Sequence, residues 1–251
     1  MTARTIRLIR EGRPDPPALD TAISRATLDG VAAGRLPETL RLHRPGRLVA
    51  FGPRDRVDPG FLAAVAAARE RGFGAIERLA GGRAAVFHEG TLAFSWAIPD
   101  PSPRDGIRRR FDEVAAIMVD ALRSLGVDAR IGEIRGEYCP GEHSVNAGGR
   151  TKLIGVGQRV VSGAAHVGGV VVVHGADTIR DVLLPVYEAL GLAWDPATVG
   201  SVEAEVPDVT WDHVEGPILT AFGTRFDLDE GRLGPGTLAL ARDLAPRHLV
   251  A

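Results

Sequence analysis

Short apolar runs separated by turn residues dominate the first hundred positions and predict buried strands. Glycine or proline bounds most of these runs, as is typical of short strands. Between Pro103 and Gly126, apolar residues recur every three or four positions and predict an amphipathic helix. A shorter helix is expected to begin at Pro59 and to end near Gly72. The predicted strands cover 48–52, 75–76, 84–87 and 91–98.

The second half of the chain predicts a hairpin followed by a helix. Gly148 and Gly149 form a two-residue loop that can adopt the positive φ angles of a tight turn. The pattern after this loop predicts two neighbouring strands, over 150–161 and 165–173. Apolar residues then return at helical spacing, so a helix is expected over 177–190.

The composition is that of an ordinary globular protein, with 45% hydrophobic and 25% charged residues. A length of 251 residues favours one domain, 1–251, with 191–251 wrapping the core as a C-terminal extension. The formal net charge of −2 gives no reason to expect nucleic acid or an anionic membrane as a partner. No apolar stretch approaches the roughly 18 residues of a membrane span, and the N-terminus lacks a secretory pattern. We therefore expect a cytoplasmic location and no membrane partner.

The chain has a single cysteine, Cys139, in the polar turn Gly136-Glu-Tyr-Cys-Pro-Gly141. One cysteine excludes an internal disulfide framework, an iron–sulfur cluster and a cysteine zinc site, so no metal is expected. A structural cysteine is usually buried in an apolar segment, whereas a nucleophile must be reachable and needs a lowered pKa. The turn is compatible with a reactive thiol that forms a thioester, and a structural cysteine stays open as the alternative.

Paired glycines form a second candidate site. Gly81 and Gly82 lie between two predicted strands, with Arg78 and Arg83 on either side and His88 after them. Without a Cβ, this backbone can approach a ligand closely, and the arginines can hold a carboxylate or phosphate. An ordinary turn between two strands explains the same glycines.

Lysine usage singles out a third candidate, Thr151-Lys-Leu-Ile-Gly-Val-Gly-Gln-Arg159. Of the 30 lysine and arginine residues only Lys152 is a lysine, which indicates a need for a compact ammonium that arginine cannot replace. Chance in an arginine-biased genome is the alternative.

His88, His143 and His166 lie near these segments, although a lone histidine is more often structural than a base. The run at 108–110 is a solvated helix face or, alternatively, a contact for phosphate or an acidic carrier.

Taken in order, these segments resemble the lipoate/octanoate transferase and ligase superfamily, which is similar in fold to biotin protein ligases. The resemblance runs from about Pro37 to Leu190 and rests on RLAGGRAAVFHEGTLAFS and on TKLIGVGQR followed by GAAHVGGVVVV. It implies an α/β fold with a mixed, largely antiparallel sheet flanked by helices. In this family a lysine followed three residues later by glycine contacts the acyl carbonyl, a role that falls on Lys152. The sequence departs from the family at Ala80, which replaces a serine or threonine, and at Arg83, which replaces a third glycine.

Within the superfamily, GEYCPGEHSV is most similar to the cysteine-dependent octanoyl and lipoyl transferases, so the resemblance implies that Cys139 is the nucleophile. The implied reaction moves the acyl group, without a cofactor, onto a lysine of a lipoyl domain of a 2-oxoacid dehydrogenase or of the glycine-cleavage H protein; an acyl carrier protein is a further candidate partner. An ATP-dependent lipoate ligase, which would use ATP and Mg²⁺, and a non-catalytic acyl- or carrier-binding relative stay open. The residues expected to bind the acyl group are Arg78, Gly81, Gly82, Arg83, His88, Gly155, Gly157, Gln158 and His166.

Overall fold

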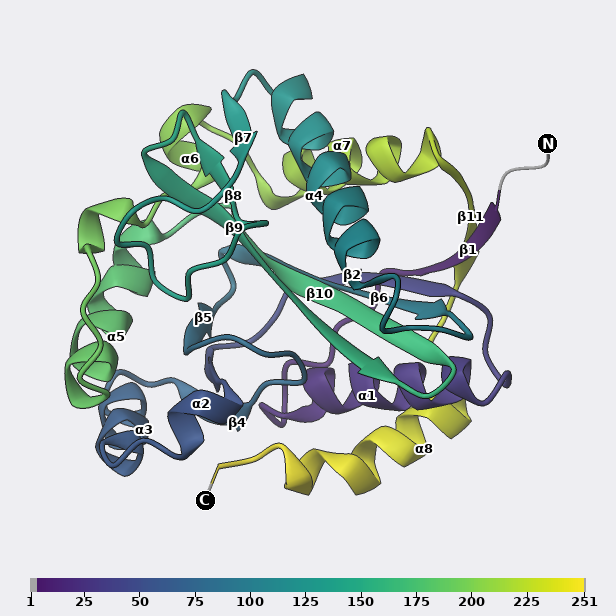
Figure 1. Cartoon of the computed structure of the whole chain (residues 1–251), viewed down its shortest axis with the longest axis horizontal. Helices are drawn as coiled ribbons and strands as arrows, with labels where there is room; N and C mark the ends of the chain where they lie inside the picture. The colour runs from purple at the N-terminus through teal and green to yellow at the C-terminus, as the bar shows by residue number, and fades with distance from the viewer. Residues whose placement is uncertain (1–3, 251) are drawn as a thin grey trace.

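A computed structural model describes residues 4–250 and places two sheets beside each other (Figure 1). The larger sheet has the strand order β11-β1-β2-β6-β10-β9-β8-β7. Its three strands at the β11 end run parallel, and every other neighbouring pair is antiparallel. The strands are β1 (Arg4–Ile9), β2 (Thr39–His43), β6 (Thr91–Pro99), β7 (Ala129–Ile131), β8 (Val145–Ala147), β9 (Thr151–Val161), β10 (Ala164–Val172) and β11 (Phe226–Gly231).

The smaller sheet has the order β4-β3-β5, with β3 (Leu48–Phe51) in its centre. Strand β4 (Gly74–Glu77) runs parallel to β3, and β5 (Ala85–Phe87) runs antiparallel to it. Helices α3 (Phe61–Glu70) and α5 (Ala176–Ala189) pack against each other and against this sheet. Shorter elements are α2 (Pro53–Arg56), α6 (Val202–Glu205) and two 3₁₀ turns, η1 (Pro196–Thr198) and η2 (Ala245–Arg247).

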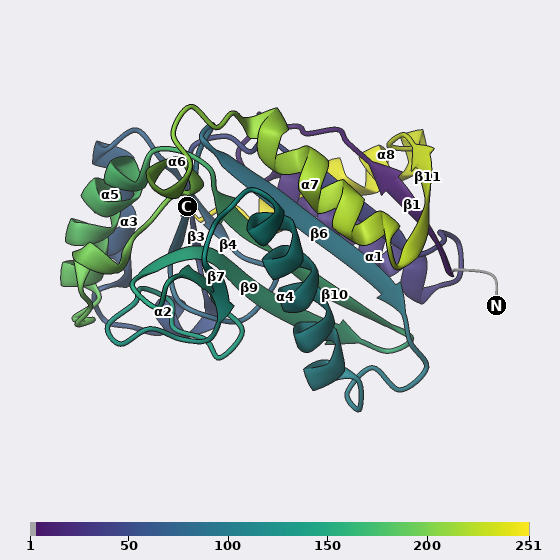
Figure 2. The same ribbon diagram turned by 90° about the horizontal axis from the view of Figure 1, so that it is seen from above.

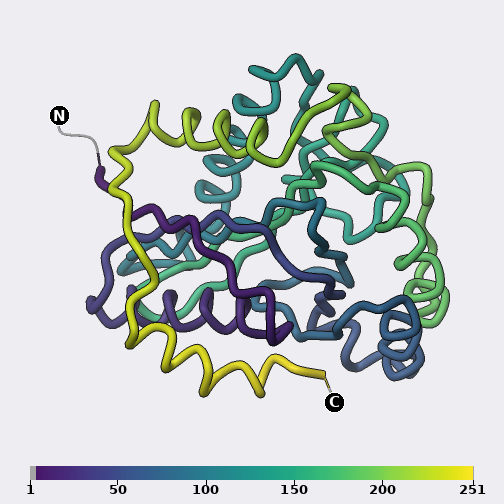
Figure 3. Tube along the Cα trace, turned by 180° about the vertical axis from the view of Figure 1, so that it is seen from behind, coloured from purple at the N-terminus to yellow at the C-terminus, as the bar shows by residue number. Residues whose placement is uncertain are grey.

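Two pairs of helices cover the larger sheet on opposite faces. Helices α4 (Ile107–Ser124) and α7 (Trp211–Gly223) lie together over β6, β9 and β10 (Figure 2). On the other face, α1 (Leu19–Ala32) packs against β6 and β10 and is itself covered by α8 (Pro235–Leu244), which Figure 3 shows running beside it. The α/β class and the mixed, largely antiparallel sheet flanked by helices are therefore confirmed.

The stripe of apolar residues on α4 forms much of the main core. Val114, Met118 and Leu122 are completely buried in this core, which also contains the completely buried Trp96 of β6. Burying an aliphatic side chain of this size stabilises the fold by about 1.5–3 kcal/mol. Toward the N-terminal end of the same helix, Ile107 is partly exposed.

The charged run at 108–110 does not form a uniformly solvated helix face. Arg108 and Arg109 are largely exposed, but Arg110 is completely buried. Its guanidinium pairs with Asp100 and donates from Nε to Gln158 Oε1 at 2.8 Å. These acceptors offset the cost of burying the charge, so the interpretation of the run as a solvated face was wrong for Arg110.

The C-terminal part of the chain contributes to both layers of helices. In the segment 191–251, α7 lies beside α4, α8 covers α1, and β11 extends the larger sheet by pairing with β1. The division of the chain into one domain with a wrapping extension at 191–251 stays a prediction. Within residues 4–250, no helix is both long enough and apolar enough to cross a membrane.

Candidate active site

A cavity of about 480 Å³ opens between the glycine pair after β4, the turn that carries Cys139, and strands β9 and β10. Cys139 and Lys152 both line it, although they are 13 residues apart in the chain. Lys152 lies at the beginning of β9 and contacts the turn through the carbonyls of Tyr138 and Cys139, so both residues reach the same space. Among the residues singled out from the sequence, Arg78, Gly81, Gly82, Gly155, Gly157 and Gln158 also line this cavity.

The backbone at Cys139 is strained and firmly held. Its φ angle is +43°, in the left-handed region that residues with a side chain rarely adopt. Its N–H donates to the hydroxyl of Tyr187 at 2.9 Å, and that hydroxyl donates to the carbonyl of Ala84 at 3.0 Å. Tyr187 is buried on α5, a helix that packs against the smaller sheet, so its hydroxyl connects the turn to Ala84, two residues after Gly82. Strain of this kind persists only when the surroundings enforce it, and it is common at functional sites.

The thiol of Cys139 is surrounded by hydrogen-bond donors. The backbone N–H of Arg83 lies 3.2 Å from Sγ, and Nη1 of Arg78 lies 3.4 Å from it. Burial raises the pKa of the Cys139 thiol, but the positive charges of Arg78 and Lys152 and the hydrogen bond from Arg83 outweigh it, so the pKa is lowered overall. A lowered pKa increases the fraction of thiolate, which is the nucleophilic form.

Gly82 leaves room for this sulfur. It has a φ angle of +113°, and a Cβ at this position would lie 2.9 Å from Cys139 Sγ and 2.8 Å from Arg78 Nη1. Both the conformation and the space therefore require glycine here. Gly82 therefore makes room for the cysteine, a role that the sequence pattern alone did not predict.

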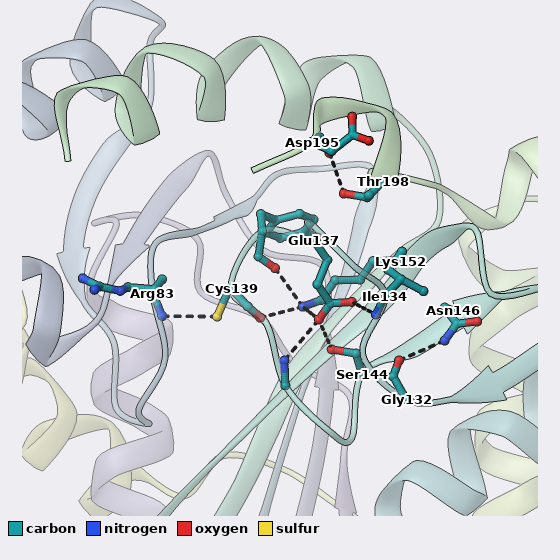
Figure 4. A network of polar contacts seen from close by, with 12 residues as sticks. Arg83, Gly132, Ile134, Glu137, Cys139, Ser144, Asn146, Lys152, Asp195 and Thr198 are labelled. Carbon is teal, nitrogen blue, oxygen red and sulfur yellow. Dashed lines mark hydrogen bonds and ion pairs between the residues drawn. The ribbon is translucent and has the colours of Figure 1, made fainter. Parts of the chain in front are cut away.

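Lys152 points from β9 toward the turn and is almost completely buried, with 1% of its surface exposed. Its ammonium donates to Glu137 Oε1 at 2.9 Å, to the carbonyl of Tyr138 at 3.0 Å and to the carbonyl of Cys139 at 2.7 Å (Figure 4). A lysine ammonium has three donors, and the protein accepts from all three. Lys152 thus holds the turn by three hydrogen bonds and places a positive charge near the thiol.

Glu137 is the main residue of this site that the sequence reasoning missed. Its carboxylate is buried and is the acidic partner of Lys152. Its position two residues before Cys139 was visible, but a glutamate in a polar turn gives no sign of burial.

A second cavity, of about 90 Å³, adjoins the first and shares Arg78, Phe87 and Gly169 with it. It is mostly apolar, and His166 and His43 lie along its wall. Burial, together with Arg159 and Arg78, lowers the pKa of His166 to about 4. Burial and Arg41 likewise lower the pKa of His43 to about 3, against the opposing effect of Asp20. Both imidazoles are therefore neutral at neutral pH.

The remaining predicted residues lie apart from the reacting atoms or contribute through their backbone. His88 lines neither cavity; it is buried beside the turn before β6, where its Nδ1 accepts from the N–H of Gly90 at 3.0 Å. The Arg83 side chain turns to Asp55 at 3.1 Å, and only its backbone reaches the thiol. The structure thus gives His88 no place in either cavity, whereas His143 lines the larger cavity and stacks on Phe111.

The arrangement is suited to nucleophilic chemistry on a carbonyl. A thiol of lowered pKa lies beside two cations and a backbone donor, at the edge of a space large enough for an elongated apolar group. Over residues 4–250, no group of three or more histidine, cysteine or acidic side chains is arranged to hold a metal ion.

Comparison with known proteins agrees with this geometry. Residues 16–223 match the family model of the lipoyl protein ligase A/B catalytic domain. The chain is 30% identical over 159 residues to the octanoyl-[GcvH]:protein N-octanoyltransferase of Anoxybacillus flavithermus, covering 63% of this chain and 57% of that protein. It is 27% identical over 172 residues to the lipoyl-[GcvH]:protein N-lipoyltransferase of Listeria monocytogenes, covering 67% of this chain and 62% of that one.

A solved structure shows the same fold. The structure of Ta0514, a lipoate protein ligase from T. acidophilum with bound lipoic acid, superposes with a TM-score of 0.74 at 23% identity, covering 98% of this chain and 96% of that one. By contrast, the chain spans only 57% and 62% of the length of the two transferases.

Proposed function

The chain belongs to the lipoyl protein ligase A/B catalytic-domain family, and on that premise we propose that it is an acyltransferase that moves an octanoyl or lipoyl group through a thioester on Cys139. The acceptor is a lysine of a lipoyl domain or of the glycine-cleavage H protein. An H-protein partner is supported by the two transferases, whose names include GcvH. A reaction that depends on one free thiol suits the reducing cytoplasm, where we place it.

The observation that carries this proposal is the position of Cys139 at the edge of the larger cavity. Its sulfur accepts from the Arg83 N–H and lies beside Arg78, so that the thiolate is stabilised before any substrate binds. A cysteine with only a structural role would need neither the strained φ angle nor these donors.

The two adjoining cavities can bind the acyl chain. We place the carbonyl at Cys139 and the chain between the glycine pair and the segment Gly155–Gln158, with its end directed toward the smaller cavity at His166. Burying seven methylenes at about 0.8 kcal/mol each contributes about 5–6 kcal/mol. Apolar burial is therefore sufficient to hold the chain without polar contacts along its length.

In the first step the Cys139 thiolate attacks the acyl carbonyl, and the bond from that carbon to the donor's sulfur or nitrogen breaks. The donor leaves as a thiolate, or as an amine once its nitrogen has gained a proton from water. In the second step the neutral amine of the acceptor lysine attacks the thioester, loses a proton to water, and expels the Cys139 thiolate. The Arg83 N–H, which donates to Cys139 Sγ at rest, lies close enough to the attacked carbonyl to stabilise the oxyanion. Lys152 lines the same cavity and adds its positive charge beside the acyl oxygen.

With a thioester donor, amide formation is downhill, and with an amide donor one amide replaces another, so neither route needs a nucleotide, and we propose no cofactor. The replacement of the third family glycine by Arg83 supports this choice, because a residue with a Cβ hinders the close backbone approach that nucleotide phosphates would need there. The alternative activity, an ATP-dependent ligase acting on free lipoate, predicts a different dependence on Cys139.

The test compares wild type with Cys139→Ser in transfer from octanoylated H protein to a lipoyl domain, without ATP. Wild type should transfer the group, and the variant should not, because serine without a strong base is a poor nucleophile. Full activity of Cys139→Ser with ATP and free lipoate, accompanied by AMP release, would instead establish the ligase.

A further inference from the structure

Glu137 lies on the buried side of the Cys139 turn and outside the larger cavity. Its side chain is completely buried, and it does not line the space proposed for the acyl group. Oε1 accepts from Lys152 Nζ at 2.9 Å, from Ser144 Oγ at 2.6 Å and from the N–H of Gly141 at 3.2 Å. Oε2 accepts from the N–H of Ile134 at 3.2 Å. Four donors thus satisfy the two oxygens of this buried carboxylate.

These contacts bracket the reacting residue in the chain. Ile134 precedes Cys139, while Gly141 and Ser144 follow it, so one carboxylate ties together both sides of the turn (Figure 4). Lys152 adds the connection to β9 through the carbonyls of Tyr138 and Cys139. The position of the thiol therefore depends on a bonded unit centred on Glu137 and Lys152.

The charge of Lys152 also depends on Glu137. Both side chains are buried, and a buried ammonium without a counter-ion tends to lose its proton. In the described part of the chain, Glu137 is the one carboxylate that forms an ion pair with Lys152. The two main-chain carbonyls can accept hydrogen bonds from the amine, but they carry no net charge to offset that of the ammonium.

We infer that Glu137 is a positioning residue for acyl transfer: its carboxylate keeps Lys152 protonated and, through it, fixes the turn that presents Cys139. The inference rests on the proposed function only for its consequence in transfer. Glu137 acts through Lys152 and lies outside the cavity proposed for the acyl group. Around the thiol, the other ionisable groups are Arg78, the phenols of Tyr138 and Tyr187, and, on the same cavity, Arg108, Glu142 and His143.

Because Lys152 is the only lysine, its protonation can be followed without ambiguity. Protein grown with ¹³C-lysine gives a single Cε resonance, whose position reports whether the side chain is an ammonium or an amine. The variant is Glu137→Gln, which keeps the shape and most acceptor capacity but removes the charge. The matched control is Glu133→Gln, the same change at an exposed glutamate four residues earlier in the same loop.

In Glu137→Gln, we expect the lysine resonance to change at clearly lower pH than in wild type, and transfer to fall by roughly a hundredfold, the size of effect that a small misplacement at a reacting centre can produce. As the pH of the assay is lowered and Lys152 regains its proton, the activity of Glu137→Gln relative to wild type at the same pH should rise. Glu133→Gln should match wild type in both measurements. A lysine resonance in Glu137→Gln that titrates as in wild type would overturn the inference.

A second variant covers the case in which Glu137→Gln does not fold. Glu137→Gln combined with Lys152→Met removes both buried charges, so it should fold when the single variant does not. Equal loss of folding in both would refute a role for Glu137 as counter-ion. The resonance needs no acyl donor, so a displaced titration in Glu137→Gln together with an inactive wild type would disprove the proposed function and leave the inference standing.

Discussion

The hydroxyl of Tyr187 offers a sharp test of how the Cys139 turn is held. It accepts from the N–H of Cys139 at 2.9 Å and donates to the carbonyl of Ala84 at 3.0 Å. Tyr187→Phe removes one oxygen and leaves both main-chain groups without this partner. Each unsatisfied buried group costs about 1–3 kcal/mol. Since Cys139 is only half-buried and can turn toward water, we expect a total of about 2–4 kcal/mol.

The measurement is the free energy of unfolding from a urea or guanidinium titration, together with the rate at which iodoacetamide alkylates Cys139. Tyr187→Phe should unfold at lower denaturant concentration with an unchanged slope, and its thiol should react differently because the left-handed backbone is released. Tyr138→Phe is the matched control for stability, because no hydrogen bond involves its hydroxyl within residues 4–250. Equal stability of Tyr187→Phe and wild type would refute the account of the turn.

Two further results are expected. Arg78→Met should raise the pH at which Cys139 becomes reactive to iodoacetamide, because the guanidinium lowers the pKa of that thiol; an unchanged or lower pH would contradict the electrostatic account. The free energy of unfolding should decrease as the pH is lowered from about 6.5 to about 4. Burial lowers the pKa of His166 to about 4 in the folded protein, whereas the imidazole of the unfolded chain takes up its proton near 6.5. In that range His166→Asn should remove a slope of about 1.4 kcal/mol per pH unit, and equal slopes in the two proteins would argue against a buried neutral imidazole.

Elements with a clear apolar period could be predicted from the sequence. The stripe on α4 and the apolar run of β3 bury a continuous face, and their boundaries lie within a few residues of those expected. The helix α1 was not predicted because polar residues such as Asp20 interrupt its apolar face. Asp20 is nevertheless buried, since it pairs with Arg41 on β2, which lies 21 positions away.

The same distinction applies to the site. Lys152 and Cys139 could be singled out because each is unique of its kind in the chain and lies in a recognisable segment. Glu137 could not, because its importance comes from four donors that only the folded turn assembles. For His88 the ligand contact suggested by its place after a glycine pair stays a prediction; in the fold this histidine is buried beside Gly90 and lines neither cavity.

The central claim is that an acyl group passes through a thioester on Cys139. Its most direct test is the intact mass of the protein after incubation with a large excess of octanoylated H protein and no lipoyl domain, followed by acid quenching and peptide mapping. Because the thioester lies uphill of the donor amide, a fraction of wild type should gain one octanoyl group, located on the peptide that contains Cys139 and removed by hydroxylamine, and Cys139→Ser should gain none. Wild type that transfers the acyl group to a lipoyl domain but never carries it on Cys139, or a Cys139→Ser variant that transfers at the wild-type rate, would contradict the account.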